Sequence, residues 1–294
     1  MLSTVANILR MDLYRLVHGK SLWIFLAVIT VLAVISAATM AYITDPAFVQ
    51  SMQAASASGA PTGVHIGFSN GSGPSANDLA ETNALVAQLA QGMTPEALVG
   101  NVFLGGGGLS CLFVVFLAIF LAAEFESGFS KNVFTVQPSR LAFLGARIVE
   151  ILVLAALFTV MIVAATLATA AVTGLELASS PLPDFALWGV LVAVVAAGFG
   201  MLTALAVWAT RKMAAGIGIG ILLASGLVTL GIQGLGMLIP SISFLADYTL
   251  SSCMGSLSLG LGAPLGAGHI ALVGAAFIAV AGALCALVLK RKDV

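Results

Sequence analysis

Long, continuously apolar stretches alternate with polar connections along this chain. Those long enough for a membrane-crossing helix, which needs about 20 residues, are Leu22–Ile43, Val102–Ala123, Ile148–Thr173, Phe185–Ala209, Met213–Ile239 and His269–Leu289. They lack the apolar–polar alternation of barrel strands, and backbone polar groups in hydrocarbon need partners within their own segment. The pattern therefore predicts an all-α polytopic membrane protein, with six transmembrane helices in a single domain over residues 1–294.

The residues before the first span form an amphipathic pattern. Apolar side chains recur every three or four positions, at Leu2, Val5, Leu9, Leu13 and Leu16. This spacing predicts a helix within residues 1–21 that lies in the lipid headgroup layer. Gly19 then allows a sharp turn into the first span. An unstructured basic lead-in is the alternative.

The 11 basic residues all fall on one side of this layout. They lie before the first span, between spans two and three, between spans four and five, and after the sixth: Arg10, Arg15, Lys20, Lys131, Arg140, Arg147, Arg211, Lys212, Lys290, Arg291 and Lys292. The connections 44–101, 174–184 and 240–268 contain no Lys or Arg. Because basic residues are enriched in cytoplasmic connections, both termini are predicted to be cytoplasmic.

Composition supports a membrane protein and gives no sign of a reactive centre. Hydrophobic residues make up 60% of the chain and charged residues only 8%, against about 25% charged in soluble domains. Cys111, Cys253 and Cys285 show neither a disulfide framework nor metal-ligand spacing. The three histidines are scattered along the chain. We expect no catalytic residue and no metal site.

The connections on the predicted outer side have distinct patterns. The first half of 44–101 is rich in Gly and Ser, which is typical of a flexible loop. Thr94 and Pro95 then predict a helix start that feeds the second span. Four successive glycines, 105–108, predict a break near the outer end of that span. The apolar but Pro-interrupted segment 240–268 is predicted to be a re-entrant hairpin or lid.

The connection 124–147 between the second and third spans is patterned. Acidic residues begin it, basic residues follow, and Phe129, Val133, Phe134 and Val136 lie between them. Ser130 is a candidate N-cap for a helix of about two turns. A short helix with an apolar face and charged ends suits docking on another protein. A solvated loop with incidental charges is the alternative.

Within the spans, ionisable residues are scarce. Glu150 is the main one, and we expect it either to pair with Arg147 on the adjacent turn or to cap a contact near the cytoplasmic face. Proton- or sodium-coupled transport normally uses ionisable residues within the membrane, so the scarcity of such residues argues against it here. Gly216 and Gly220 are four residues apart, which predicts close helix packing at these positions.

The chain resembles the membrane subunits of ABC exporters of the type 2 permease class. The likeness covers the whole layout, and its sharpest part is a Glu-x-x-x-Gly…Lys…Ser-Arg pattern carried by Glu124, Gly128, Lys131, Ser139 and Arg140. Phe129 departs from the small Thr often found after the Gly, and Arg147 stands where a Lys is common. These departures leave the subfamily open.

The resemblance implies a complex of two permeases, identical or homologous, with two separate ATP-binding subunits. Residues 1–21 would form the elbow helix and 124–147 the coupling loop, in a multi-pass protein of the bacterial plasma membrane. The residues expected to couple to the ATPase are Glu124, Glu126, Gly128, Lys131 and Arg140. ATP and magnesium would bind the partner, so this chain would be neither an enzyme nor a cofactor carrier. Membrane lipid is an expected partner and nucleic acid is not.

The spans are nearly free of charge, which favours a hydrophobic or amphipathic substrate such as a peptide, lipid or drug. The predicted function is export of such a substrate, driven by ATP. The alternative is a non-transporting membrane scaffold or sensor subunit that partners with an ATPase.

Overall fold

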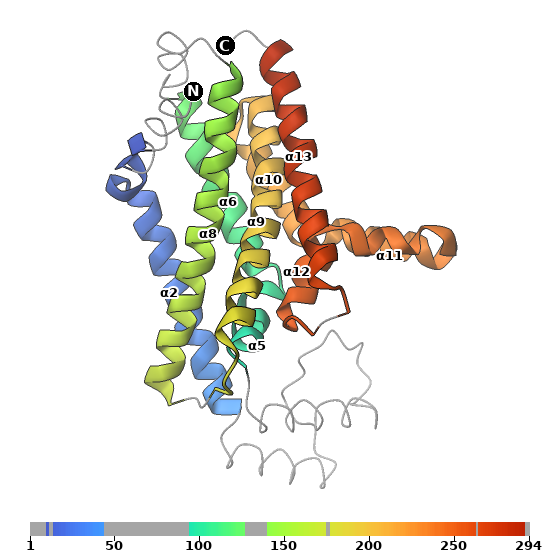
Figure 1. Ribbon diagram of the computed structural model, residues 1–294. Helices are drawn as coiled ribbons and strands as arrows, with labels where there is room; N and C mark the ends of the chain where they lie inside the picture. The colour runs from blue at the N-terminus through green and yellow to red at the C-terminus, as the bar shows by residue number, and fades with distance from the viewer. Residues whose placement is uncertain are drawn as a thin grey trace, which may run out of the picture.

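Figure 1 shows the computed structural model of the chain. The structure describes residues 10–11, 14–43, 94–126, 140–174, 177–262 and 264–291. Within these ranges the elements are all helical, with no strand element. The predicted all-α class is confirmed for this part of the chain.

The long helices run side by side as an upright bundle (Figure 1). They are α2 (Lys20–Ile43), α6 (Gly108–Glu126), α8 (Arg140–Thr173), α9 (Leu182–Thr210) and α13 (Ala267–Arg291). The central helix is α9, which packs against α6, α8, α13 and α10 (Met213–Ala224). In the most apolar part of α9, 72% of the residues are buried, against 39% in α8 and 33% in α13. The other two helices therefore turn more of their apolar surface outward.

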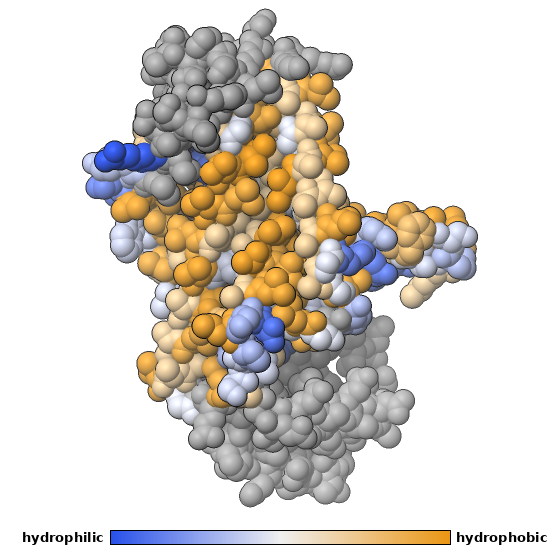
Figure 2. All heavy atoms as spheres, in the orientation of Figure 1, coloured by the Kyte–Doolittle hydropathy of each residue, from blue (hydrophilic) through white to orange (hydrophobic). Residues whose placement is uncertain are grey.

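The outward surface of the bundle is apolar. Figure 2 shows hydrophobic side chains covering much of the visible face of the bundle, and Val160, Val190 and Leu272 are among the exposed large ones. Soluble monomers rarely expose so much contiguous apolar surface. Within the described residues, α8, α9 and α13 are long and apolar enough to cross a membrane, and two bent helix pairs raise the number to five. These are the features of a multi-pass membrane protein, and the full count of six spans stays a prediction.

The first bent pair is the predicted second span with the helix that feeds it. Thr94 caps α5 (Pro95–Val99) by accepting a hydrogen bond from the Ala97 N–H at 3.3 Å, and Pro95 takes the first turn. This start was predicted and is confirmed. The chain continues as the π-helix η1 (Gly100–Leu104), and after the glycine break α6 begins at an angle of 57°. The predicted break at the glycine run is also confirmed.

The second bent pair differs from the sequence prediction of one continuous span over Met213–Ile239. The structure has α10, a break at Ser225 and Gly226, and then α11 (Leu227–Leu238), with a bend of 47°. Gly226 has φ of 76°, a conformation that side chains with a Cβ adopt at a cost. The apolar composition is the same on both sides of the break, so hydropathy alone could not reveal it.

Beyond the break the chain forms a projecting hairpin. Helix α11 leads away from the bundle (Figure 1). The 3₁₀ helix η2 (Pro240–Tyr248) packs against it, and a Cβ added at Gly236 would lie 3.0 Å from the Ser243 Cα. Helix α12 (Leu250–Ser258) then packs on α9 and η1. The predicted re-entrant segment 240–268 thus contains η2 and a second helix that rejoins the bundle.

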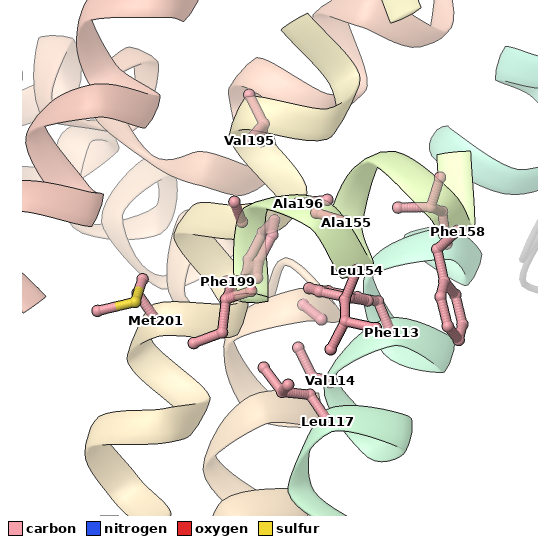
Figure 3. Close-up of a cluster of buried hydrophobic side chains, with 14 of the residues drawn as sticks. Phe113, Val114, Leu117, Leu154, Ala155, Phe158, Val195, Ala196, Phe199 and Met201 are labelled. Carbon is pink, nitrogen blue, oxygen red and sulfur yellow. The ribbon is translucent and has the colours of Figure 1, made fainter. Parts of the chain in front are cut away.

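The core lies where α6, α8 and α9 meet. Figure 3 shows its interlocking apolar side chains, which include Phe113 and Leu117 from α6, Leu154 and Phe158 from α8, and Val195 and Phe199 from α9. The helices approach closely because Gly200 lies at the contact, where an added Cβ would come within 2.8 Å of both Ile151 and Phe113.

The two glycines predicted to serve helix packing lie on the buried side of α10. A Cβ at Gly220 would lie 2.9 Å from the Val114 Cβ and 3.0 Å from the Thr203 Oγ1, so α6 and α9 both press against this position. A Cβ at Gly216 would overlap Val207 and lie 3.2 Å from the Ala118 Cβ. At Gly218, in contrast, nothing lies within 4 Å.

The substitution Gly220→Leu should destabilise the protein, and Gly218→Leu on the same helix should not. Forcing a side chain between packed helices costs about 1–3 kcal/mol, whereas the Gly218 position is open. The midpoint of thermal unfolding in detergent micelles measures the difference. Equal midpoints for the two variants would contradict the observed packing of α10.

Candidate functional site

Charged side chains meet where the lead-in to α2, the end of α6 and the start of α8 come together. Arg15 Nη2 donates a hydrogen bond to Glu124 Oε1 at 3.0 Å. Arg147 Nη2 lies 2.9 Å from the same carboxylate oxygen, and Arg147 also pairs with Glu150 one turn along α8. The Glu124 carboxylate therefore bridges two guanidinium groups. We call Arg15, Glu124, Arg147 and Glu150 the Arg147 cluster.

Three of these four side chains are buried. The exposed fraction of the side chain is 0% for Arg147, 3% for Glu124 and 6% for Glu150, against 34% for Arg15. Attraction between charges is weakly screened in such surroundings, and an unpaired buried charge is costly. The cluster contains two positive and two negative groups, so the charges balance.

Aromatic rings cover both guanidinium groups. The guanidinium carbon of Arg15 lies 4.5 Å from the centroid of the Phe120 ring, and that of Arg147 lies 5.0 Å from the centroid of Phe143. These are cation–π distances, and each adds to the ionic attraction. Both rings belong to the buried apolar core of the bundle.

The lead-in is held against the bundle by an apolar contact as well as by Arg15. Leu16, part of the predicted amphipathic stripe, is buried. Residues 14–18 are helical, and the helix is interrupted at Gly19, where the sequence predicts a turn. Across the turn, Trp23 Nε1 donates a hydrogen bond to the Val17 carbonyl at 3.0 Å. The lead-in and α2 therefore keep a defined angle.

The structure places the predicted coupling residues unequally. Glu124 lies in the Arg147 cluster, with its carboxylate turned toward groups of its own chain. Glu126 is the last residue of α6 and Arg140 the first of α8. Gly128 and Lys131 lie outside the described residues. Contact of these residues with an ATPase stays a prediction.

Pairing of Arg147 with Glu150 was predicted from their spacing and is confirmed. The participation of Arg15 and Glu124 was missed, because a contact between residues 109 positions apart leaves no local signal. The available clue was Glu124 itself. It is an acidic residue that directly follows the predicted second span and stands between Ala123 and Phe125.

The helix ends that adjoin basic residues lie at the same end of the bundle. Figure 1 shows the start of α2, the end of α6, the start of α8, and the ends of α9 and α13 at its top. Lys20 begins α2, Arg140 begins α8, Arg211 follows α9 and Arg291 ends α13. These four positions are therefore gathered at one end of the described bundle. Which side of the membrane this end faces stays a prediction.

The described residues contain no group of three or more His, Cys, Asp or Glu side chains that could hold a metal ion. No protein-family model matches the chain, and none of the curated proteins matches it either.

The substitution Arg147→Met should destabilise the protein by about 3–5 kcal/mol, because it removes the fully buried guanidinium that pairs with two buried carboxylates. Lys212→Met removes an exposed positive charge at the end of α9 and should change little. Adding Glu124→Gln and Glu150→Gln to Arg147→Met should recover part of the loss. Thermal unfolding in detergent micelles compares the variants, and wild-type stability of Arg147→Met would refute the role of the cluster.

Proposed function

We propose that this chain is the membrane-spanning subunit of an ATP-driven ABC exporter. Two such permeases, identical or homologous, would assemble with two ATP-binding subunits. The observation that carries the proposal is the Arg147 cluster, which joins the helices on both sides of the segment that bears the Glu124–Arg140 pattern.

A coupling segment needs rigid attachments, and this arrangement supplies them. Glu124 at the end of α6 and Arg147 near the start of α8 form a buried ion pair, so the two helices should move together when the segment between them is pushed. Arg15 adds the lead-in to the same unit. Closure of an ATPase against this end would then act on the lead-in, α6 and α8 together. Helix α8 itself extends for about 50 Å at 1.5 Å per residue.

An external energy source also fits the distribution of charge. In α9 the only charged side chain is Asp184 in its first turn, and α10 and α11 carry none. The buried charges at the other end are already paired with one another. Ion-coupled transporters place ionisable groups along their pathway. ATP hydrolysis on a partner is the better source for this chain.

The substrate class follows from the same shortage of charge. Pathway walls built from these helices would be apolar or weakly polar, which suits a hydrophobic or amphipathic peptide, lipid or drug. The protein would reside in the bacterial plasma membrane with both termini in the cytoplasm, as the one-sided basic residues favour. A non-transporting scaffold or sensor would share the ATPase partner but would not respond to substrate.

The double variant Lys131→Glu and Arg140→Glu should lose its ATP-binding subunit. Both positions lie in or at the edge of the proposed docking segment, and charge reversal should repel a partner that accepts basic groups. The tagged full chain is purified from membranes of its host, and ABC-type ATPase subunits in the complex are measured by mass spectrometry and ATP hydrolysis.

The matched control is Lys290→Glu with Lys292→Glu, the same change of charge at the end of the chain. This control should keep the subunit, and both double variants should insert into the membrane normally. Retention of the ATPase by the Lys131→Glu and Arg140→Glu variant would show that coupling does not use this segment. ATPase activity that never responds to any hydrophobic substrate would favour the scaffold.

A further inference from the structure

The breaks in the two bent helix pairs touch each other. Gly107 ends the break before α6, and a Cβ added to it would lie 2.5 Å from the Ala224 carbonyl oxygen and 4.0 Å from the Ser225 Cα. Ala224 is the last residue of α10, and Ser225 begins the break between α10 and α11. Two interruptions more than 100 residues apart in sequence therefore form one contact through their backbones.

Glycine is needed at this contact for two reasons. Gly107 has φ of 70° and Gly226 has φ of 76°, and both values lie in the left-handed region that favours glycine. At Gly107 the neighbouring backbone also leaves no space for a side chain. Both breaks therefore depend on glycine at these two positions.

The short helix α12 is tied to the break between α10 and α11 by its first residues. Ser251 Oγ donates a hydrogen bond to the Leu223 carbonyl at 2.9 Å, in the last turn of α10. The hydroxyls of Thr249, the N-cap of α12, and Thr229 in α11 are 2.7 Å apart. One end of α12 thus holds the helices on both sides of this break.

The other end of α12 presses on the break before α6. A Cβ added at Gly100, the first residue of η1, would overlap the backbone of Ser258 at the end of α12. A Cβ at Gly105 would lie 3.6 Å from the Ser258 Oγ. At this same end, Trp188 Nε1 of α9 donates a hydrogen bond to the Leu257 carbonyl at 2.8 Å. Helix α12 therefore bridges the breaks on the surface of the central helix.

We propose that α12 is a rigid link that makes the two helix breaks move as one unit. Its nine residues form a stiff rod of about 14 Å at 1.5 Å per residue. A displacement of α11 acts on Thr249 through Thr229, Ser251 ties the same end of α12 to Leu223 of α10, and the rod passes the displacement to Gly100 and Gly105. This inference does not depend on an ATP-driven function.

The projecting hairpin is attached to the same unit. At its base, the His269 Nε2 lies 3.0 Å from the Asp247 carbonyl oxygen, and the rings of Tyr248 and His269 pack edge to face with centroids 4.7 Å apart. Asp247 and Tyr248 end η2 immediately before α12. Movement of the hairpin relative to α13 therefore reaches α12 within two residues.

The test perturbs one break and observes the other. A spin label is placed at Gly106→Cys, a position with nothing within 4 Å, in the full chain in lipid nanodiscs with Cys111, Cys253 and Cys285 replaced by Ala. Ser251→Ala removes the bond to Leu223. Because one hydrogen bond contributes about 1 kcal/mol, the mobile fraction of the label should rise about fivefold.

The matched control is Ser243→Ala, which removes a serine hydrogen bond to the Pro240 carbonyl inside the hairpin. It should leave the label at residue 106 unchanged. Thr249→Val, which removes the contact with Thr229, should act like Ser251→Ala. The proposal is overturned if the label at residue 106 does not respond to either α12 variant.

Cys253 in α12 supplies a second readout, in a chain where only Cys111 and Cys285 are replaced. Burial, together with the nearby charge of Asp247, raises the pKa of the Cys253 thiol to about 11. Its reaction with maleimide at neutral pH should be slow and should accelerate about fivefold in Ser251→Ala. Acceleration at Cys253 with no change at residue 106 would mean that α12 moves alone, which contradicts a rigid link.

Discussion

The buried guanidinium of Arg147 determines how one end of this bundle is built. A buried positive charge must be paired, and here it is paired with Glu124 of α6 and Glu150 of α8. Those two carboxylates are balanced by a second cation, Arg15, which brings the lead-in against the bundle. This network of ion pairs thus joins three elements, the lead-in, α6 and α8, at one end of the bundle.

Helix α6 connects the Arg147 cluster to the two helix breaks. This helix carries Glu124 near its last residue and begins directly after the glycine break, about 24 Å away at 1.5 Å per residue. Its middle is held in the core by Phe113 and Leu117 (Figure 3), and Gly220 of α10 lies close to Val114 of the same helix. A push on the Arg147 cluster has a direct route to the breaks linked by α12, along a helix that is packed on several sides.

Local patterns in the sequence predicted the local features. Apolar runs predicted the helices, Thr94 and Pro95 predicted the start of α5, and spacing predicted the Arg147–Glu150 pair. The sequence could not predict contacts between residues that are far apart in the chain. Nothing near Glu124 indicates Arg15, and nothing near Gly226 distinguishes a bent helix from a straight one, because glycine is common in spans. The helix α12 was not predicted for a similar reason, since its segment is rich in Ser and Gly and its packing partners, α9 and η1, are distant in sequence.

The measurement that tests the central functional claim most directly is site-specific photo-crosslinking from Lys131. The full chain carries a photoreactive amino acid at that position in membranes of its host, and a second variant carries it at Gly231, an open position on α11. The account predicts an adduct between residue 131 and an ABC-type ATP-binding subunit, identified by mass spectrometry, and none from residue 231. Crosslinking of that subunit from residue 231 but not from residue 131 would contradict it.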